Sequence, residues 1–446
     1  MAEKSKPPRI TKGRAKRALQ VGSLTTSVGS SYVWHALKRP FQSVATKDQE
    51  LFDLHLKNAM RIVESSRELR GAFMKLVQML SMRDDIFPTE ALNILSVVQS
   101  SVPPMDYPLI RDQIKSELGK YPEQLFKNFE PTAFAAASLG QVHQATLKNG
   151  RTVVIKVQYP GVDETVEQDL KNLKALLQVF TTMARDMLRQ KFDATEIYQE
   201  MEERLREELD YINEANNLAL FQRLFADDDE VIIPRVYPDC SSRRVLTMEY
   251  VEGYKLQDMF SAGVDQSLKD WLSIKYFQMT WRQIIEFGIL HTDPHPGNYL
   301  VTYHPKIAML DFGSVRIFPE EIRTGYLHLA KAILDRDERM MAECFITLGY
   351  LTPGENPAPL VKIMYLIFEP VVEDRVYDPH DFDSVSKTVE ITNIGVENRI
   401  FNAPGHRLFL VRALWGLDSY IHQWRTITNW HRVFRECIKR AKESSS

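Results

Sequence analysis

The chain has little cysteine and no long apolar run. Its 446 residues include only three cysteines, Cys240, Cys344 and Cys437, which lie far apart. A scattered, odd-numbered set argues against a disulfide framework and favours a reducing compartment. No stretch approaches about 18 consecutive apolar residues, so we expect no transmembrane helix. No clean apolar core follows the N-terminal charges, so the pattern of a secretory signal peptide is missing too.

The chain also has little net charge, −3 in total, and this balance gives no reason to expect a nucleic-acid partner. The charge is nevertheless uneven, because residues 1–20 hold seven Lys or Arg and a single acid. Two interpretations of residues 1–45 stay open. The segment is either a surface helix on an anionic membrane or a leader that is disordered or serves in organelle targeting.

Two carboxylates and an amide lie close together in the sequence. Asn298 follows Asp293 by five residues, and Asp311 follows Asn298 by thirteen. Phosphoryl transfer uses one carboxylate near the acceptor hydroxyl, and an amide and a second carboxylate to hold Mg²⁺ on the nucleotide phosphates. Short apolar stretches at 299–301 and 307–310 flank a His-Pro turn, which predicts a hairpin. Such a hairpin would let Asn298 and Asp311 face one ion.

A lysine upstream fits the same chemistry. Two predicted strands, 141–147 and 151–157, flank an Asn-Gly hairpin turn, and the second strand contains Lys156. Kinases place their nucleotide lysine in this way, after a phosphate-binding loop. Here the loop has Gly140 but otherwise carries alanine where kinases have glycine, so its backbone has less conformational freedom. The predicted nucleotide-binding residues of the loop are Ala135, Ala136, Ala137 and Ser138.

Acidic residues follow on a long helix that we expect from about 193 to 225. Helical spacing puts Glu207, Asp210 and Glu214 on one face, and each stays a candidate partner for Lys156.

The stretch Met248-Glu249-Tyr250-Val251-Glu252-Gly253 is typical of a kinase hinge. In that interpretation the backbone groups of Glu249 and Val251 bind an adenine edge, and Met248 lines the pocket behind it. After the Asp-Phe-Gly tripeptide at 311–313, the next predicted helix begins near Glu320. The usual activation segment of about twenty or more residues is missing, which argues against an ordinary protein kinase.

Taken together, these motifs resemble the AarF/UbiB atypical kinases, a family linked to coenzyme Q (ubiquinone) biosynthesis. The resemblance covers about Leu51 to Trp430. It is carried by the segments 135–143, 154–162, 207–216, 291–298 and 310–313, and by 75–88, which looks like the family's Lys-x-Gly-Gln helix.

The resemblance adds site residues that spacing leaves undecided. It implies that Glu214 is the partner of Lys156, and that Ala137 lies closest to the phosphates. It also implies a regulatory set, in which Lys75 and Gln78 occlude the place where a peptide would bind. The other two members, Glu208 and Asp210, are implied to contact Lys75. Val77 stands where the family carries glycine.

We therefore expect an α+β, protein-kinase-like bilobal fold, with a small antiparallel-sheet N-lobe, a helical C-lobe and an N-terminal helical extension. The expected divisions are a basic leader at 1–45, the helical extension at 46–130, the N-lobe with inserted helices at 131–253, and the C-lobe at 254–446.

The expected function is that of a UbiB-type atypical kinase or ATPase, binding ATP and Mg²⁺ and supporting ubiquinone biosynthesis at a membrane surface. The expected catalytic residues are Lys156, Asp293, Asn298 and Asp311. A protein kinase and a nucleotide-gated, non-catalytic scaffold are the alternatives. Expected partners are nucleotide, an anionic membrane surface, and quinone-precursor lipids or quinone-biosynthesis proteins, with a homodimer left open. The expected location is the bacterial cytoplasm beside the inner membrane, or else the mitochondrial matrix face.

Overall fold

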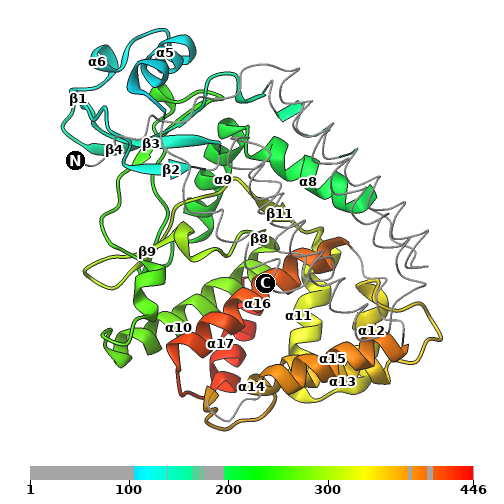
Figure 1. Cartoon of the computed structure of the whole chain (residues 1–446). Helices are drawn as coiled ribbons and strands as arrows, with labels where there is room; N and C mark the ends of the chain where they lie inside the picture. Colours follow the sequence, from blue (N-terminus) through cyan, green and yellow to red (C-terminus); the bar gives the residue numbers. More distant parts are fainter. Residues whose placement is uncertain are drawn as a thin grey trace, which may run out of the picture. The chain divides into compact units, whose positions relative to one another are not determined.

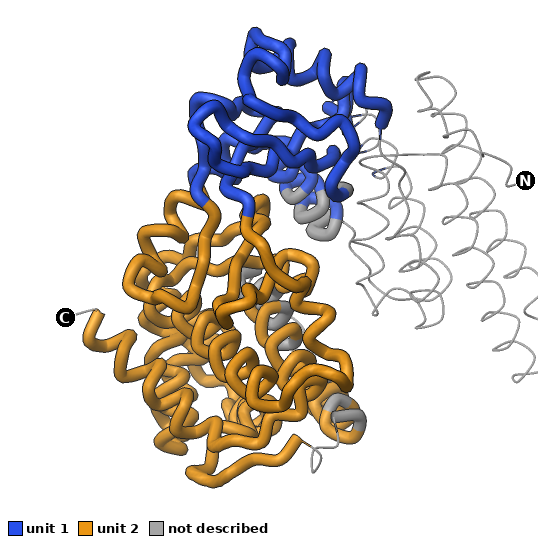
Figure 2. The backbone as a smooth tube through the Cα atoms, turned by 90° about the vertical axis from the view of Figure 1, so that its left-hand side faces the viewer, with its two compact units in different colours: residues 1–216, 235–250 blue, residues 217–234, 251–446 orange. Residues whose placement is uncertain are grey.

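The computed structural model describes most of the chain after residue 104. The described residues are 105–137, 139–163, 166, 167, 170, 174, 195–379, 384–398 and 405–444. The predictions for residues 1–104, including Lys75, Val77 and Gln78, and the prediction for Ser138 lie outside them. The chain divides into two compact units (Figure 2), residues 1–216 with 235–250 and residues 217–234 with 251–446. Residues 217–234 therefore belong with the second unit, although they precede the end of the first.

The first unit is built on an antiparallel sheet. Its strands are β1 (Asn128–Phe129), β2 (Ala135–Ala137), β3 (Gly140–Thr146), β4 (Thr152–Gln158) and β6 (Val245–Glu249). The order is β1-β3-β4-β6, with β2 paired to β3 (Figure 1). The run of β-branched residues in β4, which is buried at every position after Thr152, and the Asn-Gly turn account for the central β3–β4 hairpin. Its two strands match the predicted strands to within one residue.

Helices α5 (Tyr107–Leu118) and α6 (Pro122–Leu125) precede this sheet. Ile110 and Ile114 of α5 are fully buried in one apolar cluster with the β4 residues Val153 and Ile155. Residues 105–130, which we assigned to the helical extension, thus share the core of the sheet.

The prediction of one long acidic helix from 193 to 225 is wrong in one respect, because the chain forms two helices there. Three residues separate the end of α8 (Thr195–Glu207) from the start of α9 (Tyr211–Leu224). Asp210 lies in the break, where its Oδ1 accepts hydrogen bonds of 3.1 Å from the backbone N–H groups of Ile212 and Asn213. A side chain that caps a helix start in this way competes with continuation of the preceding helix. The break removes the shared face that we predicted for Glu207, Asp210 and Glu214.

The second unit contains short strands around the predicted hairpin. These strands are β5 (Val231–Ile232), β7 (Tyr254–Lys255), β8 (Ile289–His291), β9 (Tyr299–Val301), β10 (Ile307–Met309) and β11 (Val315–Ile317). One sheet has the order β5-β10-β9-β7, and β8 pairs with β11. The β9–β10 pair is antiparallel, with Met309 opposite Tyr299. The hairpin predicted between Asn298 and Asp311 is confirmed.

The rest of the second unit is helical. It contains α10 (Gln266–Trp281), which continues as a π-helical turn η5 (Arg282–Phe287), then α11 (Glu320–Asp335), α12 (Glu338–Thr347), α13 (Ala358–Ile367), α14 (Glu369–Val372), α15 (Ser384–Asn398), α16 (Gly405–Trp424) and α17 (Trp430–Glu443). Helices α16 and α17 both pack against α10 (Figure 1). Aromatic side chains fill this core, including Phe277, Trp281 and Phe434. In the described part of the chain, every helix is too short or too polar to span a bilayer.

Candidate active site

The loop between β8 and β9 holds Asp293 against Asn298. Nδ2 of Asn298 donates to Oδ2 of Asp293 at 3.1 Å and to the Asp293 carbonyl oxygen at 3.2 Å. Both side chains are half-buried. Because the nitrogen of the Asn298 amide is used on Asp293, its oxygen is turned the other way, where it can serve as a cation ligand. The loop therefore fixes both the carboxylate and the amide orientation.

The hairpin brings Asp311 to the same place. The backbone N–H of Leu310 donates to the Asn298 carbonyl oxygen at 2.9 Å and extends the β9–β10 ladder by one pair. Leu310 thus pairs with Asn298, and Asp311 is the next residue along the chain. Its Oδ1 accepts from the backbone N–H of Gly313 at 3.1 Å. The side-chain amide of Asn298 thus connects it to Asp293, and backbone pairing places Asp311 beside it, so three residues that we predicted as catalytic lie on adjoining parts of one loop and one hairpin.

The backbone around Asp311 is anchored from several sides. The Phe312 ring is fully buried and meets Phe221 edge-on with centroids 4.8 Å apart, while the His291 ring lies 5.5 Å away. Nε2 of His291 donates to the Asp311 carbonyl oxygen. Nδ2 of Asn217, from α9, donates to the Phe312 carbonyl oxygen at 2.9 Å. These contacts restrict the rotation of the Asp-Phe-Gly segment.

Thr292 stands where protein kinases have the arginine of His-Arg-Asp. It is fully buried, its N–H donates to the Ser314 carbonyl oxygen at 3.1 Å, and the two hydroxyl oxygens are 2.6 Å apart. The loop between β8 and β9 is thereby bonded to the segment after Gly313. That segment is short, since α11 begins at Glu320. The predicted absence of a long activation segment is confirmed.

A C-terminal helix packs directly on the loop between β8 and β9. The hydroxyl of Tyr420, on α16, donates to the Pro294 carbonyl oxygen. One turn earlier, Gly416 lies so close that an added Cβ would be 3.0 Å from Cβ of Pro294. Tyr420 belongs to a buried cluster with Tyr276 and Tyr299, and burial, reinforced by the Asp293 carboxylate, raises the pKa of all three hydroxyls. These phenols therefore stay neutral beside Asp293.

In the first unit, Lys156 and Glu214 form a buried ion pair. Nζ of Lys156, on β4, is 2.5 Å from Oε1 of Glu214, on α9, and the residues are 7% and 3% exposed. Spacing had left three acids open as partners, and the structure pairs the lysine with the one that the family resemblance implied. Asp210 caps α9, as described above, and the Glu208 carbonyl oxygen accepts from Nε2 of Gln158 at 3.4 Å. The predicted contact of these two residues with Lys75 lies outside the described residues.

The alanine-rich loop is a tight hairpin. Ala135 pairs with Val142 and Ala137 with Gly140, so the alanines form strand β2. A Cβ on Gly140 would lie 2.2 Å from the Val157 carbonyl oxygen. Glycine is required there because two strands approach closely. From the sequence we had connected this glycine with the backbone freedom of a phosphate-binding loop.

The predicted hinge coincides with one of the three points at which the chain passes between the two units, the one between Tyr250 and Val251. Met248 is buried on β6 opposite Val154, and Glu249 is exposed at the end of the strand. The N–H of Glu249 donates to the Arg235 carbonyl oxygen at 2.8 Å. An adenine contact by Glu249 would therefore use its carbonyl group.

Sequence reasoning missed Asn217, Ser314 and Tyr420. A signal existed for Asn217, because it lies three residues after Glu214 and hence on a neighbouring part of one helix face. Tyr420 gave no signal, since more than a hundred residues separate it from Pro294.

The two candidate metal ligands of the second unit, Asn298 and Asp311, fit a magnesium ion that would be bound together with a nucleotide. Asn298 and Asp311 offer only oxygen donors, and Mg²⁺ usually takes one or two protein carboxylates together with water and phosphate oxygens. Among the described residues, no three His, Cys, Asp or Glu side chains gather to hold a metal by themselves.

Comparisons with known proteins agree with this arrangement. The family described as "ABC1 atypical kinase-like domain" matches residues 97–345. The chain is 34% identical over 380 residues to the chloroplastic protein ACTIVITY OF BC1 COMPLEX KINASE 3 of Arabidopsis thaliana, covering 83% of this chain and 52% of that protein. It is 29% identical over 424 residues to the mitochondrial atypical kinase COQ8B of Rattus norvegicus, covering 93% and 79%.

The chain spans about half the length of several curated relatives. One of them is the mitochondrial atypical kinase coq-8 of Caenorhabditis elegans. It is 31% identical over 368 residues, which cover 80% of this chain and 48% of that protein. A solved protein of Mycobacterium tuberculosis in complex with erythromycin has a TM-score of 0.63 at 24% identity, covering 88% of this chain and 98% of that one. This likeness confirms the predicted kinase-like α+β fold class. On the family match and on these motifs, the chain belongs to the ABC1 atypical kinase-like family, which includes the AarF and COQ8 kinases.

Proposed function

We propose that this chain binds Mg-ATP and transfers or releases its terminal phosphate, as an atypical kinase or ATPase of the UbiB type. The observation that carries the proposal is the grouping of Asp293, Asn298 and Asp311 by one loop and one hairpin. Together these side chains offer the base and the metal-ligand oxygens that phosphoryl transfer uses.

Each residue has a role in this proposal. Asn298 and Asp311 hold Mg²⁺, which neutralises charge on the nucleotide phosphates when it is bound. Asp293 accepts the proton of the attacking hydroxyl or water, and its orientation is set by Asn298. Lys156 contacts phosphate oxygens, with Glu214 keeping its ammonium group in position.

The acceptor is proposed to be something other than a docked peptide. Only residues 314–319 separate Gly313 from α11, and β11 occupies half of them. A protein kinase docks its peptide substrate on a much longer segment. This spacing disfavours the protein-kinase alternative and leaves a small molecule, a lipid or water as acceptor.

The wider role is proposed from the relatives. Two of them are named as mitochondrial COQ8-type atypical kinases and others as chloroplastic kinases. We propose that this chain supports ubiquinone biosynthesis at the surface of a membrane, with anionic lipid, quinone-precursor lipids or quinone-biosynthesis proteins as partners. The bacterial inner membrane and the matrix face of a mitochondrion are the two proposed settings, and a homodimer is a proposed assembly.

The test is phosphate release from Mg-ATP by the purified full chain, with and without anionic liposomes and a phenolic mimic of a quinone precursor. We expect turnover that rises with lipid and disappears in Asp293→Asn and Asp311→Asn. Calorimetry on the same variants separates the roles. Asp311→Asn should lose Mg²⁺-dependent nucleotide binding, whereas Asp293→Asn should retain it. Tight nucleotide binding without any turnover, whatever acceptor is offered, would favour the nucleotide-gated scaffold instead.

A further inference from the structure

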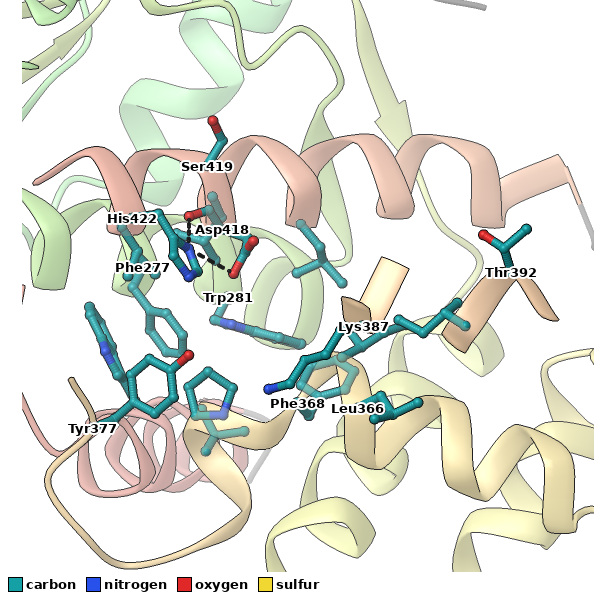
Figure 3. A pocket seen from close by; sticks show the side chains of 18 residues that line it. Phe277, Trp281, Leu366, Phe368, Tyr377, Lys387, Thr392, Asp418, Ser419 and His422 are labelled. Carbon is teal, nitrogen blue, oxygen red and sulfur yellow. Dashed lines mark hydrogen bonds and ion pairs between the residues drawn. The ribbon is translucent and has the colours of Figure 1, made fainter. Parts of the chain in front are cut away.

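A cavity of about 330 Å³ lies among the helices of the second unit (Figure 3). Its walls come from α10, α13, α14, α15, α16 and the start of α17, and most of the lining is apolar, including Phe277, Phe368, Leu417 and Ile421. Cavities that hold small ligands begin at about this volume, and an apolar cavity of about 150 Å³ already accepts benzene. One or two fused rings therefore fit in this space.

Two indole N–H groups on the cavity wall have no hydrogen-bond acceptor. They belong to Trp281, which is 5% exposed, and Trp430, which is 1% exposed. In Figure 3 the nitrogen of Trp281 is on the side of its ring toward Tyr377 and His422. A buried donor without an acceptor costs about 1–3 kcal/mol of stability, and such donors are rare in folded proteins. Two of them on the wall of one cavity are therefore unusual if the two side chains serve only for packing. An acceptor atom on a bound molecule would remove that cost.

Charged groups at the rim are matched with one another. Nδ1 of His422 lies 3.4 Å from Oδ1 of Asp418, and Lys387 forms an ion pair with Glu369. The carboxylate of Asp418 thus faces the imidazole of His422, and the one lysine of the lining is paired, so neither is left to match a charged ligand. The charges favour an uncharged molecule, since burying an unmatched charge in this apolar space is costly.

We propose that this cavity binds a neutral molecule of one or two rings carrying a carbonyl oxygen, which accepts a hydrogen bond from the indole of Trp281, Trp430 or both. This site is separate from the Asp293–Asp311 group and does not depend on the proposed phosphotransfer.

Two bicyclic probes of nearly equal size test the proposal. 1-Tetralone carries one carbonyl oxygen, and tetralin lacks it. Titrations of the full chain, without nucleotide, should show 1-tetralone binding about fivefold more tightly, which corresponds to one net hydrogen bond. In ¹H–¹⁵N spectra of the six tryptophans, 1-tetralone should move the indole N–H signal of Trp281 or Trp430 downfield.

Two other tryptophans serve as internal controls. The indole of Trp271 donates to Glu230 at 3.0 Å, and that of Trp424 is also buried without an acceptor but does not line the cavity. Neither signal should move. Trp281→Phe and Trp430→Phe keep an aromatic wall and should reduce the advantage of 1-tetralone over tetralin. If a variant fails to fold, the wild-type spectra decide. Equal affinity for both probes without an indole shift, a shift confined to Trp271 or Trp424, or no binding of either probe would overturn the proposal.

Discussion

Asn217 donates a hydrogen bond of 2.9 Å from its side-chain amide to the carbonyl oxygen of Phe312. Three residues earlier on the same helix, Glu214 forms the ion pair with Lys156. Helix α9 thus supplies the partner of Lys156, the proposed nucleotide lysine, and a bond to the backbone beside Asp311, the proposed metal ligand.

Asn217→Ala should lower the rate of phosphate release several-fold, because the peptide next to Asp311 loses a fixed donor. The loss of one hydrogen bond should also reduce the free energy of unfolding by about 1 kcal/mol. Steady-state turnover and urea denaturation measure the two effects. Asn216→Ala is the matched control, since Asn216 is exposed on the same helix. Equal turnover of the two variants would show that the Phe312 contact does not matter for the reaction.

The buried Lys156–Glu214 pair should show strong non-additivity. Replacing one partner leaves the other charge buried, with an expected cost of about 3–5 kcal/mol in the free energy of unfolding. The double variant Lys156→Met with Glu214→Gln should recover part of that loss. Urea denaturation of the two single variants and the double variant gives the coupling energy. If the single costs simply add, the two charges do not stabilise one another in solution.

Tyr420→Phe should reduce kcat for ATP turnover while leaving KM for ATP close to its original value. The lost hydroxyl anchors the Pro294 carbonyl beside Asp293, and no nucleotide-binding residue is altered. Tyr303→Phe makes the same chemical change at a residue that is 60% exposed and serves as the control. A rise in KM with unchanged kcat in Tyr420→Phe would contradict a role in positioning the catalytic loop.

Two buried thiols should make the protein less stable in alkaline solution. Burial raises the pKa of Cys344 from 9.0 to about 11 and that of Cys437 to about 12. The unfolded chain loses these protons near pH 9, while the folded chain keeps them, so stability that is complete below pH 9 should decline between pH 9 and 12. Urea midpoints at several pH values measure the decline.

The variant Cys344→Ala should weaken the alkaline part of this dependence, and its midpoint near pH 7 gives the separate packing cost. Thiol labelling of the native chain near pH 8 offers a second check. The half-buried Cys240 should react first, and Cys344 and Cys437 should react only as the chain unfolds. Rapid labelling of all three would mean that the two thiols are not buried.

Local patterns in the sequence determined much of this protein. The turn residues and the short apolar stretches beside them predicted the β3–β4 and β9–β10 hairpins, because both depend on neighbours within about twenty residues. The β9–β10 hairpin in turn places Asn298 and Asp311 together. The short spacing between Gly313 and the next helix shows that the long activation segment of protein kinases is missing there. The motifs also indicated the family, which the comparisons confirm.

Other features were decided only by the tertiary structure. Helical spacing alone left Glu207, Asp210 and Glu214 equivalent, but Asp210 caps a new helix and Glu214 forms the ion pair with Lys156. Contacts between distant segments, such as Tyr420 with Pro294, leave no mark in a local pattern, because packing joins them after the chain has folded. The cavity beside Trp281 has the same origin, since its walls come from six helices whose facing sides no single segment specifies.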